Sequence, residues 1–251
     1  MSQTLLITGS SGIAAATARL AAGRGNKIFV IAKREKECEV LNEEIPDLAY
    51  AVADVADYSA VQKALAAGIE IFGMIDAVFN VAGISGRSLG DGALHECTPE
   101  AWQAMMNTHA AGTFHVCREA IGCCIGARRK GTIVNTSSVL ARFPEREYFA
   151  THAYAASKGA IESMSLAAAA YYASLGIRIN VIAPGLVRTP MSARAQTNEK
   201  IVSYIAHKQP LKGGLVEAED IARIALFLLS DESNPMTGEV IRADAGWAVT
   251  G

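Results

Sequence analysis

Residues 4–14 read TLLITGSSGIA and join a candidate strand to a glycine turn. The apolar run LLI is typical of a buried strand, and Gly9 and Gly12 stand where the backbone could approach a phosphate. The spacing is not G-x-G-x-x-G, because Ala14 or Ala15 takes the place of a third glycine. Taken alone, the stretch fits both a nucleotide-binding turn and a plain strand–helix junction.

The same strand–helix alternation recurs along the chain. Short runs, mostly apolar without alternation, predict strands at Thr4–Thr8, Lys27–Ala32, Leu48–Ala53, Ile75–Asn80, Thr132–Ser137, Ile177–Ala183 and Glu239–Ala243. Between them, segments of helical length and pattern include Ala14–Arg24, Ser59–Phe72, Ala101–Gly122, Ala153–Ser174 and Ala218–Leu229. Strand–helix alternation repeated this many times predicts a doubly wound α/β sheet in one domain covering residues 1–251.

Two segments show no regular pattern, Gly83–Pro99 and Arg188–Gly214. Each follows the carboxyl end of a predicted strand, where ligands bind in open α/β sheets. Long connections at that edge are candidates for substrate contact. We expect residues 188–214 to form a substrate-binding loop or helix segment.

Composition excludes several classes of function. A net charge of −2 gives no basic excess for nucleic acid or an anionic membrane. No apolar run reaches the ~18 residues of a membrane span, and a strand from Thr4 leaves no room for a signal peptide. Five cysteines without a C-x-x-C pair fit a reducing compartment. We expect a cytoplasmic protein without a metal site.

Tyr154 and Lys158 form a Y-x-x-x-K pair in a predicted helix. Residues four apart share a helix face, so the phenol and the ammonium should lie side by side. A nearby positive charge favours the phenolate, which predicts a lowered pKa for Tyr154 and a proton donor and acceptor near neutral pH. Such pairs are also common on solvated helix faces, so the pair indicates little by itself.

Polar residues at the ends of three predicted strands add context. The pair Ser137-Ser138 ends one strand, NVAG beginning at Asn80 ends another, and PGLVRT ending at Thr189 follows a third. The carboxyl ends of parallel strands converge on one crevice. These positions therefore predict one shared ligand site.

In this order, the motifs resemble the short-chain dehydrogenase/reductase family, in its compact single-domain branch. The resemblance covers nearly the whole chain and includes TGSSGIA, Asp54, NVAG, the Ser/Tyr/Lys set, PGLVRT, Glu219–Ala222 and Asp244–Gly246. It implies a single-domain, doubly wound Rossmann fold with a mainly parallel sheet of about seven strands. It also implies an oxidoreductase acting on a small-molecule carbonyl or alcohol.

The resemblance implies a role for each matching position. Tyr154 would give a proton to the carbonyl oxygen or take it back, Lys158 would bind the nicotinamide ribose, and Ser138 would hydrogen-bond the substrate oxygen. The cofactor would supply or take the hydride. The implied cofactor contacts are Gly9, Ser11, Gly12, Ile13, Lys33, Arg34, Asp54, Val55, Asn80, Ala82, Gly83, Tyr154, Lys158, Pro184, Gly185, Val187 and Thr189.

Three features depart from the family pattern. His109 stands where many members carry a catalytic asparagine, and it belongs either to a proton relay or to helix packing. The loop Arg142–Ala153 looks longer than usual and predicts part of the substrate wall. The glycine turn is one residue short, with Ala14 replacing its last glycine. We still expect the diphosphate at the N-terminus of the following helix.

The end of the second predicted strand bears on cofactor choice. NAD specificity in such folds uses an acidic residue there, and Ala32 takes its place, followed by Lys33 and Arg34. Two cations can pair with the 2′-phosphate of NADP. The sequence favours NADP over NAD, although the same residues also fit an ordinary charged loop.

The substrate and the assembly are less legible. Arg142, Arg146, Arg188 and Arg194 either contact an anionic substrate or are solvated surface residues. The helix Ala153–Ser174 is apolar nearly all round, which predicts burial on more than one face. In the family this helix commonly lies in a symmetric interface, so the resemblance implies a homo-oligomer, a tetramer or a dimer.

Three readings of function stay open at this point. The first is an NADP-dependent carbonyl reductase or alcohol dehydrogenase. The second is an NAD-dependent alcohol dehydrogenase. The third, from another class, is a non-catalytic dinucleotide sensor or scaffold, which the short turn and His109 favour and the intact Ser138, Tyr154 and Lys158 oppose.

Overall fold

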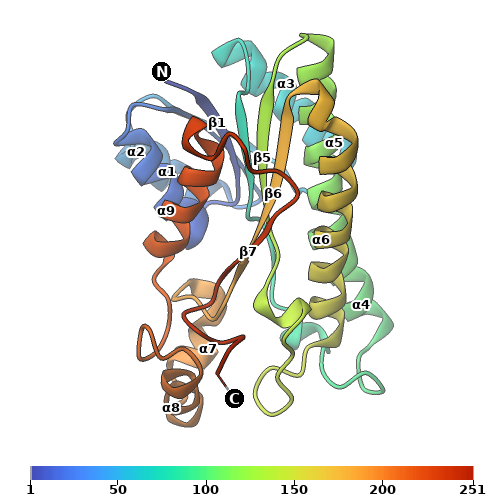
Figure 1. The fold of residues 1–251 in the computed structure, drawn as a ribbon, viewed down its shortest axis with the longest axis vertical. Helices are drawn as coiled ribbons and strands as arrows, with labels where there is room; N and C mark the ends of the chain where they lie inside the picture. Colours follow the sequence, from blue (N-terminus) through green and yellow to red (C-terminus); the bar gives the residue numbers. More distant parts are fainter. Residues whose placement is uncertain (1, 251) are drawn as a thin grey trace.

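A seven-stranded parallel sheet forms the centre of the molecule (Figure 1). The computed structural model describes residues 2–250. The strands, in the spatial order β3-β2-β1-β4-β5-β6-β7, are β1 Thr4–Thr8, β2 Lys27–Ala32, β3 Leu48–Val52, β4 Ala77–Asn80, β5 Gly131–Thr136, β6 Ile177–Pro184 and β7 Val240–Ala243. All neighbouring pairs are parallel, which confirms the predicted doubly wound Rossmann fold.

Helices cover both faces of this sheet. They are α1 Ile13–Ala22, α2 Glu35–Glu44, α3 Tyr58–Phe72, α4 Pro99–Met105, α5 Gly112–Gly126, α6 His152–Tyr172, α7 Ala193–Gln196, α8 Glu199–Lys208 and α9 Ala218–Leu229. Figure 1 shows α1, α2 and α9 on one side, with α3, α5 and α6 on the other. Within residues 2–250, none of these helices is long and apolar enough to cross a bilayer.

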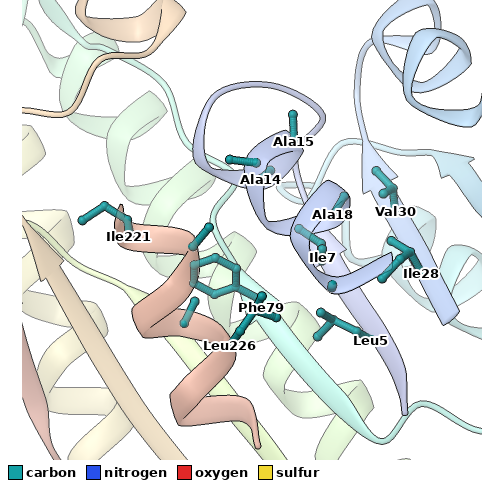
Figure 2. Packing of buried hydrophobic residues seen from close by; sticks show 14 of the residues in the cluster. Leu5, Ile7, Ala14, Ala15, Ala18, Ile28, Val30, Phe79, Ile221 and Leu226 are labelled. Carbon is teal, nitrogen blue, oxygen red and sulfur yellow. The ribbon is translucent and has the colours of Figure 1, made fainter. Parts of the chain in front are cut away.

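The core divides into two layers, one on each face of the sheet. Successive side chains of β1 point to opposite faces, so Leu5 and Ile7 pack in one layer and Leu6 in the other. Figure 2 shows Ile7 and Phe79 between α1 and α9. The small residues of α1, among them Ala14 and Ala18, let this helix approach the sheet closely. Continuous apolar strands are what a sheet covered on both faces requires.

The structure differs from the sequence prediction in two helical regions. Helix α2 was missed, because only Cys38 and Leu41 of its residues are buried and the apolar stripe is weak. Residues 188–214, expected to form a loop or helix segment, contain α7 and α8. The single helix predicted over Ala101–Gly122 is interrupted by a π-helical turn at Met106–Ala111. Such turns are frequent at functional sites.

Candidate active site

One cavity of about 260 Å³ opens at the carboxyl ends of β1, β4, β5 and β6. It is the place that the topology of a doubly wound sheet assigns to ligands. The sequence-predicted residues that line it are Gly9, Ser11, Gly12, Ile13, Ala82, Gly83, His109, Ser138, Tyr154, Lys158, Pro184, Gly185, Val187 and Thr189. The strand tips and the helix pair therefore meet at one site.

Ser138, Tyr154 and Lys158 lie together in this cavity. The Tyr154 phenol lies beside the side chain of Ser138, which follows β5, and both residues line the cavity. The Lys158 ammonium lies 5.7 Å from the centre of the Tyr154 ring and donates a 2.8 Å hydrogen bond to the carbonyl oxygen of Thr136. A hydroxyl, a phenol and an amine thus face the same space.

Burial dominates the protonation of this group. It raises the pKa of Tyr154, and the neighbouring Ser138 hydroxyl only partly opposes the rise. Burial also lowers the pKa of Lys158 to about 7. The expectation of a lowered tyrosine pKa is therefore wrong for this structure, because the loss of water around the phenolate dominates. Tyr154 holds its proton at neutral pH.

The first turn of α6, which carries Tyr154, is capped by a residue far away in sequence. Thr151 precedes the helix but makes no side-chain cap. Instead, the buried carboxylate of Asp91 accepts hydrogen bonds of 3.0 Å from the backbone N–H groups of Ala153 and Tyr154. A negative group at this end also matches the helix dipole. Asp91 therefore fixes the position of the phenol-bearing turn, a role that no local sequence pattern announces.

His109 is buried in the π-helical turn between α4 and α5. Its Nε2 atom accepts a 3.0 Å hydrogen bond from the N–H of Ile84, so Nδ1 carries the proton and donates to Ser157 Oγ at 2.8 Å. Ser157 in turn donates to the carbonyl oxygen of Tyr154. Burial, with Lys158 nearby, holds the pKa of His109 well below its usual range. Both ring nitrogens are thus bonded to protein groups, an arrangement that ties the loop after β4 to α6.

The glycine turn has the features of an anion site. Gly9 and Gly12 have φ values of 97° and 55°, which favour glycine. A side chain at Gly12 would also meet Thr189, because an added Cβ would lie 2.9 Å from its Cγ2. No side chain caps the N-terminus of α1, and its first turn has no acidic residue. Apart from that of Ala14, which donates to the carbonyl oxygen of Ser11, its first-turn N–H groups are therefore available to a diphosphate.

A second feature fits a dinucleotide. Thr136 Oγ1 is buried in the cavity wall and has no hydrogen-bond partner within residues 2–250. A polar atom left so in a protein interior is costly unless a ligand satisfies it. Together with the uncapped start of α1, it makes the residues present compatible with a nicotinamide dinucleotide.

Some predicted cofactor contacts lie outside this cavity. Asn80 is in the core, where its amide donates a 2.9 Å hydrogen bond to the Asn135 side chain of the neighbouring strand. Asp54 accepts hydrogen bonds from Lys33 Nζ and from the N–H of Ala56, and Val55 is buried beside it. These positions stay predicted cofactor contacts.

Glu37 is a charged neighbour of the glycine turn that the sequence reading missed. Its carboxylate pairs with Arg34 at 2.7 Å and accepts a 2.8 Å hydrogen bond from Ser10 Oγ. These contacts lower the pKa of Glu37 against the effect of its burial. The residue is in the first turn of α2, so recognising that helix would have brought it to light.

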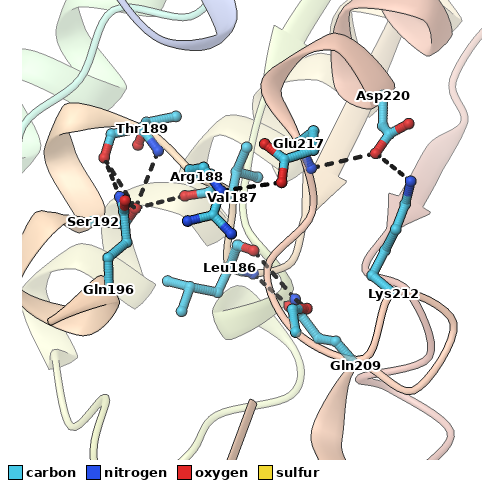
Figure 3. Close-up of polar contacts among 11 residues, drawn as sticks. Leu186, Val187, Arg188, Thr189, Ser192, Gln196, Gln209, Lys212, Glu217 and Asp220 are labelled. Carbon is cyan, nitrogen blue, oxygen red and sulfur yellow. Dashed lines mark hydrogen bonds and ion pairs between the residues drawn. The ribbon is translucent and has the colours of Figure 1, made fainter. Parts of the chain in front are cut away.

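Of the four arginines considered for anion binding, two have carboxylate partners. Arg142 pairs with the buried Glu162, and Arg188 pairs with Glu217 at 3.0 Å (Figure 3). Arg146 is exposed and outside the cavity lining, whereas Arg194 lines the cavity. Arg87, which the sequence reading did not single out, lines it too.

The loop after β6 is held by side chains from the following helical segment. Ser192 Oγ donates to the carbonyl oxygen of Val187 at 2.6 Å, and Gln196 donates to that of Thr189 at 2.8 Å (Figure 3). Gln209, at the end of α8, accepts from the N–H of Leu186 at 2.6 Å. Residues 188–214 therefore fix one wall of the cavity.

Comparisons with known proteins agree with this geometry. A family model described as enoyl-(acyl carrier protein) reductase matches residues 7–248. Momilactone A synthase of Oryza sativa is 34% identical over 246 residues, covering 96% of this chain and 88% of that protein. The 3-oxoacyl-[acyl-carrier-protein] reductase of Thermotoga maritima is 33% identical over 252 residues, covering 97% of each chain.

A solved structure shares both the fold and part of the sequence. A variant of the actinorhodin polyketide ketoreductase, crystallised with NADPH, superposes with a TM-score of 0.90 at 25% identity. The match covers 99% of this chain and 98% of that one. With the family model spanning nearly all its residues, the chain belongs to the short-chain dehydrogenase/reductase family of oxidoreductases.

Proposed function

We propose that the protein is an NADP(H)-dependent oxidoreductase that interconverts a ketone and a secondary alcohol, with Tyr154 as the general acid and base. The observation that carries the proposal is the meeting of Ser138, Tyr154 and Lys158 in the cavity that the glycine turn lines. Its similarity to a 3-oxoacyl-[acyl-carrier-protein] reductase and to a ketoreductase crystallised with NADPH supports it further.

The residues of the chain divide the chemistry among them. The Ser138 hydroxyl holds the substrate oxygen, and Tyr154, protonated at neutral pH, donates its proton to that oxygen during reduction. In the reverse direction Tyr154 takes the proton back. Lys158 holds the ribose beside the phenol, and the start of α1 holds the diphosphate. The bound nicotinamide supplies or accepts the hydride.

A purified-protein screen tests this function. The oxidation of NADPH and of NADH is followed by absorbance against a panel of ketones, keto acids and keto thioesters. We expect turnover of at least one carbonyl class. Dinucleotide binding with no turnover of any of them supports instead the non-catalytic sensor or scaffold.

One observation favours the second candidate, an NAD-dependent dehydrogenase. The carboxylate of Glu37 accepts a hydrogen bond from Ser10 of the glycine turn and forms an ion pair with Arg34. A carboxylate near a 2′-phosphate repels it. Two observations favour NADP instead. Lys33 and Arg34 bring two positive charges to the end of β2, and Ala32 stands where NAD-specific folds carry an acidic residue.

We expect NADPH to have a lower Michaelis constant than NADH. Glu37→Gln should lower the Michaelis constant for NADPH about threefold or more, because it removes a negative charge and releases Arg34. Arg34→Gln should raise that constant about tenfold and leave NADH unaffected. Arg19→Gln, which removes a paired arginine from α1, is the matched control. A lower constant for NADH in the wild type contradicts the assignment.

We also propose a homo-oligomer built on the outer faces of α5 and α6. Phe114 of α5 and Leu166 of α6 are 46% and 40% exposed, and Ala167 and Ala170 lie exposed near Leu166 on α6. Burying such side chains against a second copy removes apolar surface from water. Light scattering after gel filtration should give the mass of a dimer or a tetramer, and Leu166→Glu should shift it toward the monomer. A monomeric mass for the wild type refutes the proposal.

A further inference from the structure

Arg87 and Arg194 converge at the cavity from distant parts of the chain. Arg87 belongs to a short 3₁₀ turn after β4, and Arg194 to α7. Both guanidiniums donate through Nη2 to the same backbone carbonyl oxygen, that of Tyr148, with a distance of 3.1 Å for Arg194. Both residues line the cavity that also holds Tyr154.

Neither of these two guanidiniums forms an ion pair with a carboxylate within residues 2–250, unlike Arg142 and Arg188. Each guanidinium has five N–H donors, and one shared carbonyl oxygen satisfies only a small part of them. Two cations are thus held side by side, with donors to spare, beside a cavity.

The carboxylates that act on the charge of Arg87 already accept other hydrogen bonds. Burial lowers the pKa of Arg87, and the charge of Arg194 lowers it further, while Asp91 and Glu145 act in the opposite direction. Asp91 accepts from the N–H groups at the start of α6. Glu145 accepts from the N–H groups of residues 147–149. Within residues 2–250, the two arginines therefore repel each other without an ion-paired carboxylate.

The remaining walls of the cavity are mainly apolar. Side chains of Leu140, Phe149, Leu186 and Trp247 line it together with the reactive Tyr154. A molecule that fits presents a carbonyl to the phenol and an apolar body to these side chains. Arg87 and Arg194 line the same cavity.

We propose that Arg87 and Arg194 bind an oxyanion group, a carboxylate or a phosphate, on the carbonyl substrate. The inference rests on the proposed carbonyl chemistry and adds the class of substrate. Paired guanidiniums suit such a group, because planar forks of N–H donors match its oxygens. Arg142 and Arg188, the candidates from sequence with carboxylate partners of their own, play no part in it.

Matched pairs of substrates test the site. One series compares keto acids from 3-oxobutanoate to 6-oxoheptanoate with their methyl esters, and another compares dihydroxyacetone phosphate with dihydroxyacetone. In the wild type we expect the anionic member of at least one pair to have the higher kcat/KM. Arg87→Gln and Arg194→Gln should each lower that value about tenfold and leave the neutral partner unchanged. Arg129→Gln, which removes an arginine paired with Asp76 away from the cavity, is the control.

A structural role for these arginines gives a different result. If Arg87→Gln lowers kcat/KM equally for the anionic and the neutral member, the Arg87 side chain only holds the backbone at Tyr148 in place. The proposal is then overturned. Equal preference for both members in the wild type overturns it as well. Arg194→Lys keeps a charge and should restore part of the preference. The pair that responds shows whether the group is a carboxylate or a phosphate.

A binding measurement separates this proposal from the proposed function. Trp247 lines the cavity, so its fluorescence in a Trp102→Phe background reports occupancy without turnover. Anionic ligands should bind at least about tenfold more weakly to the Arg87→Gln protein. If they do and no carbonyl is reduced, the function fails while the anion site stands. If carbonyls are reduced but Arg87→Gln does not weaken the binding of anionic ligands, only the proposed anion site is wrong.

Discussion

Replacing Tyr154 with phenylalanine should lower kcat/KM for the carbonyl substrate by about 10²- to 10⁴-fold, the usual contribution of a positioned proton donor. The change removes one hydroxyl from a partly buried side chain that lies beside Ser138 and leaves the ring in place. The α1 N-terminus and the glycine turn are untouched. The dissociation constant for NADPH, measured by its fluorescence, should therefore stay within about twofold of the wild-type value.

Tyr172→Phe is the matched control, because it also removes a tyrosine hydroxyl, at the opposite end of α6. Wild-type activity in this variant, together with the loss in Tyr154→Phe, assigns the proton transfer to one hydroxyl. If Tyr154→Phe keeps most of the turnover of a substrate that the wild type reduces, another group supplies the proton. The general-acid assignment is then wrong.

The strands and the meeting of the strand tips could be predicted from sequence. Buried parallel strands are continuous apolar runs, so β1 and β2 were placed with their observed bounds. Parallel strands end at one edge, which brings Ser138 toward the predicted helix carrying Tyr154 and Lys158. Both predictions follow from local pattern and from the geometry of a sheet.

The rest depends on contacts between distant segments. Asp91 meets the start of α6, Glu37 meets Ser10, and Arg87 meets the Tyr148 carbonyl. Each of these partners is far away in sequence, and no periodicity records which side chain a loop presents to another. The pKa of Tyr154 is raised, whereas the sequence predicted that it would be lowered, for a related reason. Its direction is set by burial, whereas the Y-x-x-x-K spacing reveals only a neighbour.

Removing the carboxylate that caps α6 should damage stability and catalysis together. Asp91→Ala leaves the N–H groups of Ala153 and Tyr154 without their acceptors, in a place where Ala153 is fully buried. An unsatisfied buried donor and a lost helix cap each cost roughly 1–2 kcal/mol, so the free energy of unfolding should fall by about 2 kcal/mol or more. Because Tyr154 lies in the loosened turn, kcat should also fall, by about 10- to 100-fold.

Two further variants decide whether the catalytic loss comes from the position of Asp91. Asp91→Asn keeps one oxygen acceptor and should retain a stable fold with an intermediate kcat, so the test survives if the alanine variant does not fold. Asp57→Ala removes the cap of α3, whose side chain accepts from the N–H of Ala60 at 3.1 Å, away from the cavity. It should lower stability by about 1 kcal/mol and leave kcat unchanged. An equal fall in kcat for Asp57→Ala would mean that general destabilisation explains the lost activity. A fall confined to the Asp91 variants shows that the cap positions the Tyr154 phenol for catalysis.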